Sequence, residues 1–190
     1  LSYRKAIEIN PRFADANYYL ACILLKKKNF KEGWIRYESR WEIEDLTKRI
    51  NTSKPQWEPK NKGTVLLWPE QGLGDTVLFS SLIPELVNKV DQLIVLTDKR
   101  LIPLFKRSFV EKIIYIDQKD FISDEVYDYQ IPMGSLPKIF RASKENFKEV
   151  PLKLLKADEA KTQIYRKKLI ANNHKKIVGI SWTTINKLYN

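Results

Sequence analysis

The chain has 190 residues, which is enough for one α/β domain with a small appendage and for a sizeable hydrophobic core. Its formal net charge at pH 7 is +11, but its 34 basic residues are interleaved with 23 acidic ones along the whole sequence. Such a spread favours a solvated surface with no specific partner over a nucleic-acid ligand. Attraction of anionic sugar nucleotides or anionic glycans to the basic surface is the other alternative.

Two further features narrow the class of protein. No apolar run approaches the roughly eighteen residues of a transmembrane segment, and no signal peptide is visible. A single cysteine, Cys22, excludes an internal disulfide, and its apolar neighbours indicate that it fills the core. We therefore expect a reduced, cytoplasmic setting.

Three helices are predicted at the N-terminal end, over residues 1–10, 14–27 and 30–45. The first ends at Asn10-Pro11, because a residue that precedes proline is pushed out of the α region. The third carries an apolar stripe, because its aromatic side chains recur at helical spacing; they are Phe30, Trp34, Tyr37 and Trp41. We expect Trp34 and Trp41 to pack at an interface rather than to contact a ligand.

This helical segment resembles the end of one tetratricopeptide repeat followed by a complete repeat. The positions that match the repeat pattern are Ala6, Pro11, Leu20, Ala21, Leu24, Gly33 and Tyr37. The register then fails, because Arg40 and Asp45 stand one 34-residue period beyond the matching alanine and proline. We expect a last, degenerate repeat that docks on the next domain, with further repeats before Leu1.

Residues 50–62, with the sequence INTSKPQWEPKNK, have two prolines and little periodicity, which indicates a linker. The domain boundary is expected between Thr47 and Gly63. Trp57 is expected to anchor the linker to the domain that follows.

The centre of the chain is the segment 65–86, VLLWPEQGLGDTVLFSSLIPEL. A buried strand over 65–68 leads through a loop with Gly72 and Gly74 into a helix over 76–89, which is typical of nucleotide-binding α/β domains. The loop lacks a dinucleotide fingerprint, and Asp75 stands where a phosphate would sit, so we do not expect a pyrophosphate site. The helix should bend at Pro84, which removes the hydrogen bond to the Ser80 carbonyl.

Further elements follow in an alternating order that predicts a parallel sheet with helices on both faces. Strands are predicted over 93–96, 113–116 and, more weakly, 127–131. Helices are predicted over 101–109, capped by Thr97-Asp98, and over 154–172, opened by Asp158 or a neighbour. One more buried strand is predicted over 176–182.

Three features of the chain carry a family resemblance: the segment EQGLGDT, the apolar helix with an internal proline that follows it, and the repeat that precedes it. Through them the chain resembles bacterial tetratricopeptide-repeat glycosyltransferases of the two-domain GT-B type. These are relatives of heptosyltransferases and O-linked N-acetylglucosamine transferases. The resemblance covers nearly the whole chain and implies repeat helices over 1–46, a linker over 47–63 and a Rossmann-like acceptor-side domain over 64–175. It also implies that residues 176–190 open a donor-binding domain that continues beyond this chain.

The resemblance implies that Asp75 is the general base of an inverting glycosyltransferase, because such transfer needs an acceptor for the proton of the attacking hydroxyl. The alternative role for Asp75 is a helix N-cap worth about 1 kcal/mol. Other candidate substrate-binding residues are Glu70, Gln71, Gly72, Gly74, Thr76, Gly134 and Ser135. The alternative for Glu70 and Gln71 is that their side chains satisfy backbone groups of a tight turn. The alternative for the loop glycines is that they allow a positive φ or a close approach of the backbone to neighbouring atoms.

The expected partners are a nucleotide sugar, bound mainly through the missing C-terminal domain, and a glycan or protein acceptor. A protein partner of the repeats is a further expectation. We expect no metal or other cofactor, because no CxxC, HExxH or paired-carboxylate motif is present, and no catalytic dyad at His174, the single histidine. The competing interpretation is a non-catalytic interaction module, in which repeats recruit a partner and the α/β domain is a degenerate platform.

Overall fold

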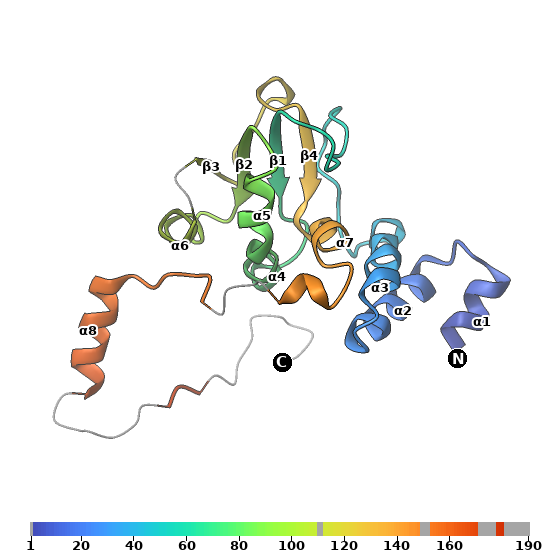
Figure 1. Ribbon diagram of the computed structural model, residues 1–190, viewed down its shortest axis with the longest axis horizontal. Helices are drawn as coiled ribbons and strands as arrows, with labels where there is room; N and C mark the ends of the chain where they lie inside the picture. The colour runs from blue at the N-terminus through green and yellow to red at the C-terminus, as the bar shows by residue number, and fades with distance from the viewer. Residues whose placement is uncertain (1, 110–111, 149–152, 171–177, 181–190) are drawn as a thin grey trace. The chain divides into compact units, whose positions relative to one another are not determined.

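The computed structural model describes residues 2–109, 112–148, 153–170 and 178–180. These residues fall into two compact units, one up to Lys156 and the other from Ala157. The first unit contains the helical repeat and the sheet, and the second contains a single described helix (Figure 1).

The helical repeat consists of α1 (Ser2–Ile9), α2 (Ala14–Lys26) and α3 (Phe30–Tyr37). The side chains that α2 buries recur at helical spacing, as an amphipathic helix requires: Ala16, Asn17, Leu20, Ala21 and Leu24. The two helices α2 and α3 approach closely at Gly33, where an added Cβ would lie 2.7 Å from Leu25 Cδ2. Gly33 thus allows the tight hairpin that its place in the repeat pattern predicts.

Two predictions for this region are wrong. The third helix does not run to residue 45: α3 ends at Tyr37 and continues as a 3₁₀ turn, Glu38–Glu42, because Glu38 and Arg40 are drawn into contacts with the α/β domain. Cys22 is exposed rather than buried, since it lies beside the buried stripe of α2 and not within it.

The α/β part is built on a four-stranded, fully parallel sheet in the order β3-β2-β1-β4. Its strands are β1 (Thr64–Trp68), β2 (Gln92–Thr97), β3 (Ile113–Asp117) and β4 (Tyr129–Pro132). The parallel sheet confirms the predicted fold class. The fourth strand starts two residues later than predicted, because Tyr127 instead packs its ring into the core and bonds Thr52 through its hydroxyl.

Alternate residues of the strands feed two separate cores, as the side-chain alternation of a strand requires. One face, with Val65, Leu67, Leu93 and Val95, packs against α4 (Leu73–Phe79), α5 (Ile83–Val87) and α7 (Leu136–Phe140). The other face, with Leu66, Trp68, Ile94 and Leu96, is covered among the described residues by Trp41 and by loop side chains such as Ile50 and Ile122.

Helices on both faces were predicted, so the loop-covered face is a correction. The connection from β3 to β4 crosses β2 and β1, and in a doubly wound sheet it would carry a helix on the second face. Here it is the segment 118–128, which holds only a short 3₁₀ turn, Asp124–Val126.

The helix predicted over 76–89, with a bend at Pro84, is instead interrupted and forms α4 and α5. A 3₁₀ turn, Ser80–Leu82, separates α4 from α5, and Pro84 occupies the first turn of α5. The next helix, α6 (Ile102–Ser108), is not capped by Asp98. That carboxylate instead bonds the N–H and guanidinium of Arg100, and so closes a turn before the helix.

The segment between the repeat and β1 has no helix or strand of its own but is firmly attached. Trp57 is 1% exposed, and its backbone N–H donates to the Gln130 carbonyl of β4 at 2.8 Å. Farther back, the Thr52 and Ser53 hydroxyls donate to the Asp124 carboxylate, each at 2.8 Å. The prediction that Trp57 anchors this linker is confirmed.

The second unit contains α8 (Glu159–Ile170), which starts five residues later than predicted. Asp158 opens it, as its Oδ1 accepts the Lys161 N–H at 3.0 Å. The predicted strand 176–182 lies mostly outside the described residues, and its described part, Val178–Ile180, has no regular secondary structure. His174 also lies outside them. No described helix is both long and apolar enough to cross a membrane.

Candidate functional site at the C-terminal edge of the sheet

The loop between β1 and α4 places Asp75 at the C-terminal edge of the sheet, where ligands of open α/β sheets gather. Gly72 is the N-cap of α4, and Asp75 lies in the first helical turn without a capping hydrogen bond. The N-cap alternative for Asp75 is therefore wrong. Its carboxylate is half-buried and, within the part of the chain that the structure describes, has no hydrogen-bond or ion-pair partner.

Gly72, Gly74 and Thr76 shape the backbone between β1 and the first turn of α4. The Asp75 Oδ2 would lie 3.3 Å from a Cβ placed on Gly72, so Gly72 gives that carboxylate room. Neither Gly72 nor Gly74 has positive φ; among the described glycines that conformation belongs to Gly63, at φ +118°. Thr76 is buried and donates its hydroxyl to the Gly72 carbonyl at 3.1 Å, so it closes the first turn.

Glu70 and Gln71 both turn toward other parts of the chain. The Glu70 carboxylate, 1% exposed, accepts the Gly134 N–H at 2.9 Å and the Arg40 Nη2–H at 3.0 Å. Burial, the largest influence, raises the pKa of Glu70, although Arg40 and Gly134 act in the opposite direction. Gln71 donates to the Tyr37 hydroxyl at 2.6 Å. Of the two roles left open for Glu70, this geometry supports the bond to a backbone group.

Arg40 is the residue that joins the helical repeat to this loop. Its side chain is fully buried, and its guanidinium lies 4.7 Å and 4.4 Å from the ring centroids of Tyr37 and Trp41. It donates to Ser135 Oγ at 2.8 Å as well as to the carboxylates of Glu38 and Glu70. Sequence reasoning did not name Arg40 as a site residue. The available signal was the arginine at a position where the repeat pattern has alanine.

The segment after β4 completes this polar cluster. Ser135 is fully buried and donates its hydroxyl to Glu38 at 2.8 Å, while Lys138 reaches the same carboxylate at 3.3 Å. Burial raises the pKa of Glu38, but Arg40, Lys138 and Ser135 together outweigh it and lower the pKa overall. At Gly134 an added Cβ would lie 2.2 Å from Glu70 Oε1. Gly134 and Ser135 thus bind the cluster internally and do not line an open crevice.

A cavity of about 510 Å³ opens beside the loop, between the ends of β1 and β2 and the segment that leaves the repeat. Apolar side chains and polar groups both contribute to its wall, which is formed by Asp45, Leu46, Thr47, Lys48, Ile50, Trp68, Pro69, Glu70, Gln71, Leu96, Gln118 and Lys119. Gln71 and Glu70 belong to it, whereas Asp75 does not. In the described ranges, no three His, Cys, Asp or Glu side chains gather into a potential metal site.

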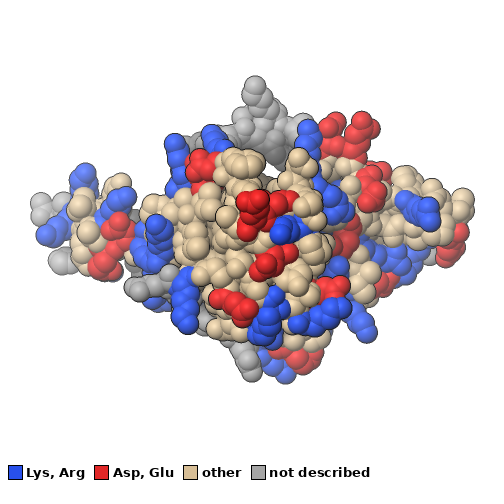
Figure 2. All heavy atoms as spheres, turned by 90° about the horizontal axis from the view of Figure 1, so that it is seen from above, with Lys and Arg blue, Asp and Glu red and all other residues tan. Residues whose placement is uncertain are grey.

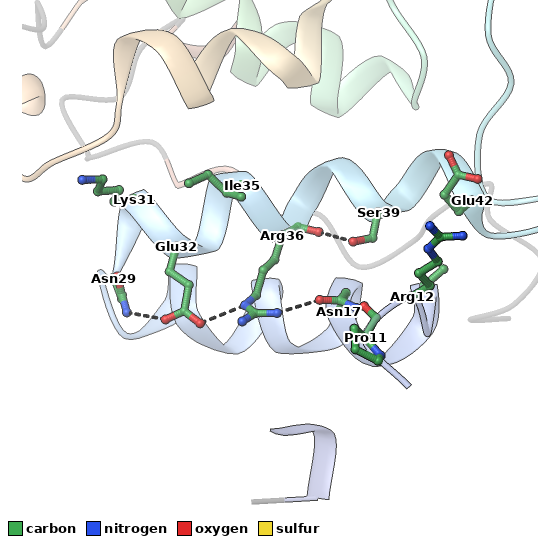
Figure 3. A pocket seen from close by; sticks show the side chains of 11 residues that line it. Pro11, Arg12, Asn17, Asn29, Lys31, Glu32, Ile35, Arg36, Ser39 and Glu42 are labelled. Atoms are coloured by element: carbon green, nitrogen blue, oxygen red, sulfur yellow. Dashed lines mark hydrogen bonds and ion pairs between the residues drawn. The ribbon is translucent and has the colours of Figure 1, made fainter. Parts of the chain in front are cut away.

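The helical repeat carries a second hollow, of about 890 Å³, along α3 and the start of α2 (Figure 3). Arg36 crosses it, donating to Glu32 at 2.8 Å and to Asn17 at 2.6 Å. Arg12 and Lys31 add two more basic side chains to the wall. We call this hollow the repeat groove.

The charge on the surface is mixed. On the face in Figure 2, basic and acidic side chains alternate rather than form one continuous basic patch. This agrees with the interleaving along the sequence, and it gives no support to a nucleic-acid footprint on that face.

Residues 2–34 match the family model described as a tetratricopeptide repeat, so the chain contains such a repeat. The chain is also similar to Protein FlbA of Caulobacter vibrioides, with 34% identity over 96 residues. That match covers 47% of this chain and 16% of FlbA. No solved structure matches the chain.

Proposed function

We propose that this chain is the last repeat and the acceptor-side α/β domain of a glycosyltransferase that uses a nucleotide sugar, with Asp75 as its general base. In such a reaction the acceptor hydroxyl oxygen bonds to the anomeric carbon while the bond from that carbon to the phosphate oxygen breaks. The nucleoside diphosphate leaves, and the acceptor proton passes to the base.

The supporting observation is the state of Asp75. Its neighbours Glu70 and Gln71 are both occupied by contacts within the chain, whereas its own carboxylate has no partner among the described residues. It stands half-exposed at the C-terminal edge of a parallel sheet. The cavity beside the same loop, lined by Glu70 and Gln71 and not by Asp75, is large enough for a sugar unit. An unpaired carboxylate at that place is available to accept a proton.

The test uses the full-length protein, sugar nucleotides with labelled sugars, and cell extract as the source of acceptor. Asp75→Asn preserves size and removes the base, and transfer of label is expected to fall by about 10²–10⁴-fold. Asp91→Asn is the matched control, because Asp91 is exposed in the turn before β2, at the opposite end of the sheet. Equal transfer by Asp75→Asn and Asp91→Asn would exclude Asp75 as the base.

A second candidate function is a protein-interaction module without catalysis. The tetratricopeptide match and the repeat groove favour it. The groove also holds Glu32 and Glu42, and Arg36 pairs with Glu32, so Arg12 and Lys31 are the basic side chains that would meet an acidic segment of a partner. Calorimetry with a glutamate-rich peptide and a lysine-rich peptide of equal length tests this candidate. It predicts binding of the acidic peptide alone, lost in Arg12→Glu, together with no sugar transfer by the full-length protein.

A further inference from the structure

The loop that leads into the first turn of α4, where Asp75 lies, has few side-chain attachments of its own. Within the described residues, side-chain hydrogen bonds of the segment 70–75 are made by Glu70 and Gln71 alone. Gly72 and Gly74 have no side chains, and nothing lies within 4 Å of the place where a Cβ on Gly74 would be. Asp75 lies in the first turn of α4, and Thr76 and Phe79 of that helix are buried. What holds Glu70 and Gln71 therefore decides how the chain enters this turn.

Both residues bond the helical repeat, and Glu70 also accepts the Gly134 N–H with its carboxylate and the Thr47 hydroxyl with its carbonyl. Gln71 bonds the Tyr37 hydroxyl at the end of α3, and Glu70 bonds Arg40 in the 3₁₀ turn that follows. These two anchors are themselves fixed. Tyr37 is 8% exposed and packs against Tyr18 and Trp34, at centroid distances of 5.7 Å and 5.5 Å.

Arg40 is fixed even more firmly than Tyr37. Its guanidinium lies near the rings of both Tyr37 and Trp41 and donates to three side chains, two of them carboxylates. A planar guanidinium that is fully buried and bonded on several sides has little freedom to move. It therefore gives the loop a rigid point of attachment.

From these contacts we infer that Tyr37 and Arg40 are positioning residues for Asp75. The last repeat is then a structural half of the candidate site and not a separate recruitment module. This inference rests on the proposed function for the role of Asp75, but the order of the loop can be measured without any substrate.

The first experiment measures backbone order parameters by NMR in the chain of residues 1–190. Tyr37→Phe keeps the packed ring and removes only the hydroxyl that Gln71 bonds. The amides of Gly72, Gly74 and Asp75 are expected to drop from a rigid value of about 0.85 to below about 0.6. Gln71→Met removes the same bond from the other side and should have the same effect, while the amides of β2 stay unchanged.

Tyr115→Phe is the matched control, since it removes a buried hydroxyl that has no hydrogen-bond partner among the described residues. It is expected to leave the loop amides as they are. If Tyr37→Phe and Gln71→Met likewise leave the order parameters of the loop unchanged, the inference is overturned.

The second experiment separates this inference from the proposed function. In the full-length protein, Tyr37→Phe is expected to lower kcat for sugar transfer about tenfold with little change in KM for the sugar nucleotide, because a misplaced base affects the chemical step. If the loop becomes mobile in Tyr37→Phe but Asp75→Asn keeps full activity, the positioning by the repeat is supported and Asp75 is not the base. If the loop stays rigid in Tyr37→Phe but Asp75→Asn is inactive, Asp75 remains the candidate base and the positioning role of Tyr37 is refuted.

Discussion

Replacement of Arg40 by methionine tests whether one buried cation holds the repeat and the α/β domain together. The substitution leaves Glu70, whose side chain is 1% exposed, without its cation and removes a donor from Glu38 and Ser135. Breaking a buried ion pair in this way costs about 3–5 kcal/mol. That is a large share of the roughly 5–15 kcal/mol by which domains are stable.

Urea unfolding of residues 1–190, followed by tryptophan fluorescence, measures this loss. With a slope of about 1–3 kcal/mol per molar urea, the midpoint should fall by at least about 1 M. Arg100→Met is the matched control, since Arg100 pairs with Asp98 at 2.7 Å but its side chain is 66% exposed, and it should cost about 0–1 kcal/mol. A loss at Arg40 no larger than the loss at Arg100 would refute the reasoning.

The pH dependence of the same variant adds a second check. Burial raises the pKa of Glu70 in the folded wild type, and losing Arg40 should raise that pKa further. A folded-state pKa above the unfolded one means that the folded protein holds more protons, so this contribution to stability is present at low pH and is lost as the pH rises through the folded pKa. The stability difference between Arg40→Met and the wild type should therefore shrink between pH 8 and pH 5. A difference that grows toward pH 5 would contradict this.

Two further substitutions test the contacts that fasten the loop and the linker. Gly134→Ala forces a Cβ to within 2.2 Å of Glu70 Oε1 and should lower the free energy of unfolding by about 1–3 kcal/mol. Gly74→Ala is the control: nothing lies within 4 Å of its added Cβ, so the Tm of the protein should stay unchanged or rise. Trp57→Ala should cost about 3–5 kcal/mol in urea unfolding, because the 1% exposed indole belongs to the main core; a loss under 1 kcal/mol would show that the linker is not anchored there.

The elements that the sequence predicted well are those with strong local signals. Apolar runs mark β1 and β2 because these strands are buried on both faces of the parallel sheet. An apolar run also marks β3, although this edge strand buries only Ile113. Pro84 marks the break between α4 and α5 because it cannot donate a helical hydrogen bond. Two of the weaker predictions depended on distant partners: the third helix ends early and β4 is shifted, each through packing that no local pattern encodes. Cys22 is exposed for a local reason, since it lies off the helical stripe that α2 buries.

The sequence by itself indicated a tetratricopeptide repeat and an acidic loop after the first strand, because each of these depends on residues close together in the chain. Only the tertiary structure decided what Arg40, Glu70 and Ser135 do. Glu70 and Ser135 lie 30 and 95 positions from Arg40 along the chain, and they meet it only when the repeat packs on the sheet. Burial then makes each unpaired charge costly, so Arg40 bonds both Glu70 and Ser135. Asp75, in the first turn of α4, is left as a carboxylate without a partner among the described residues.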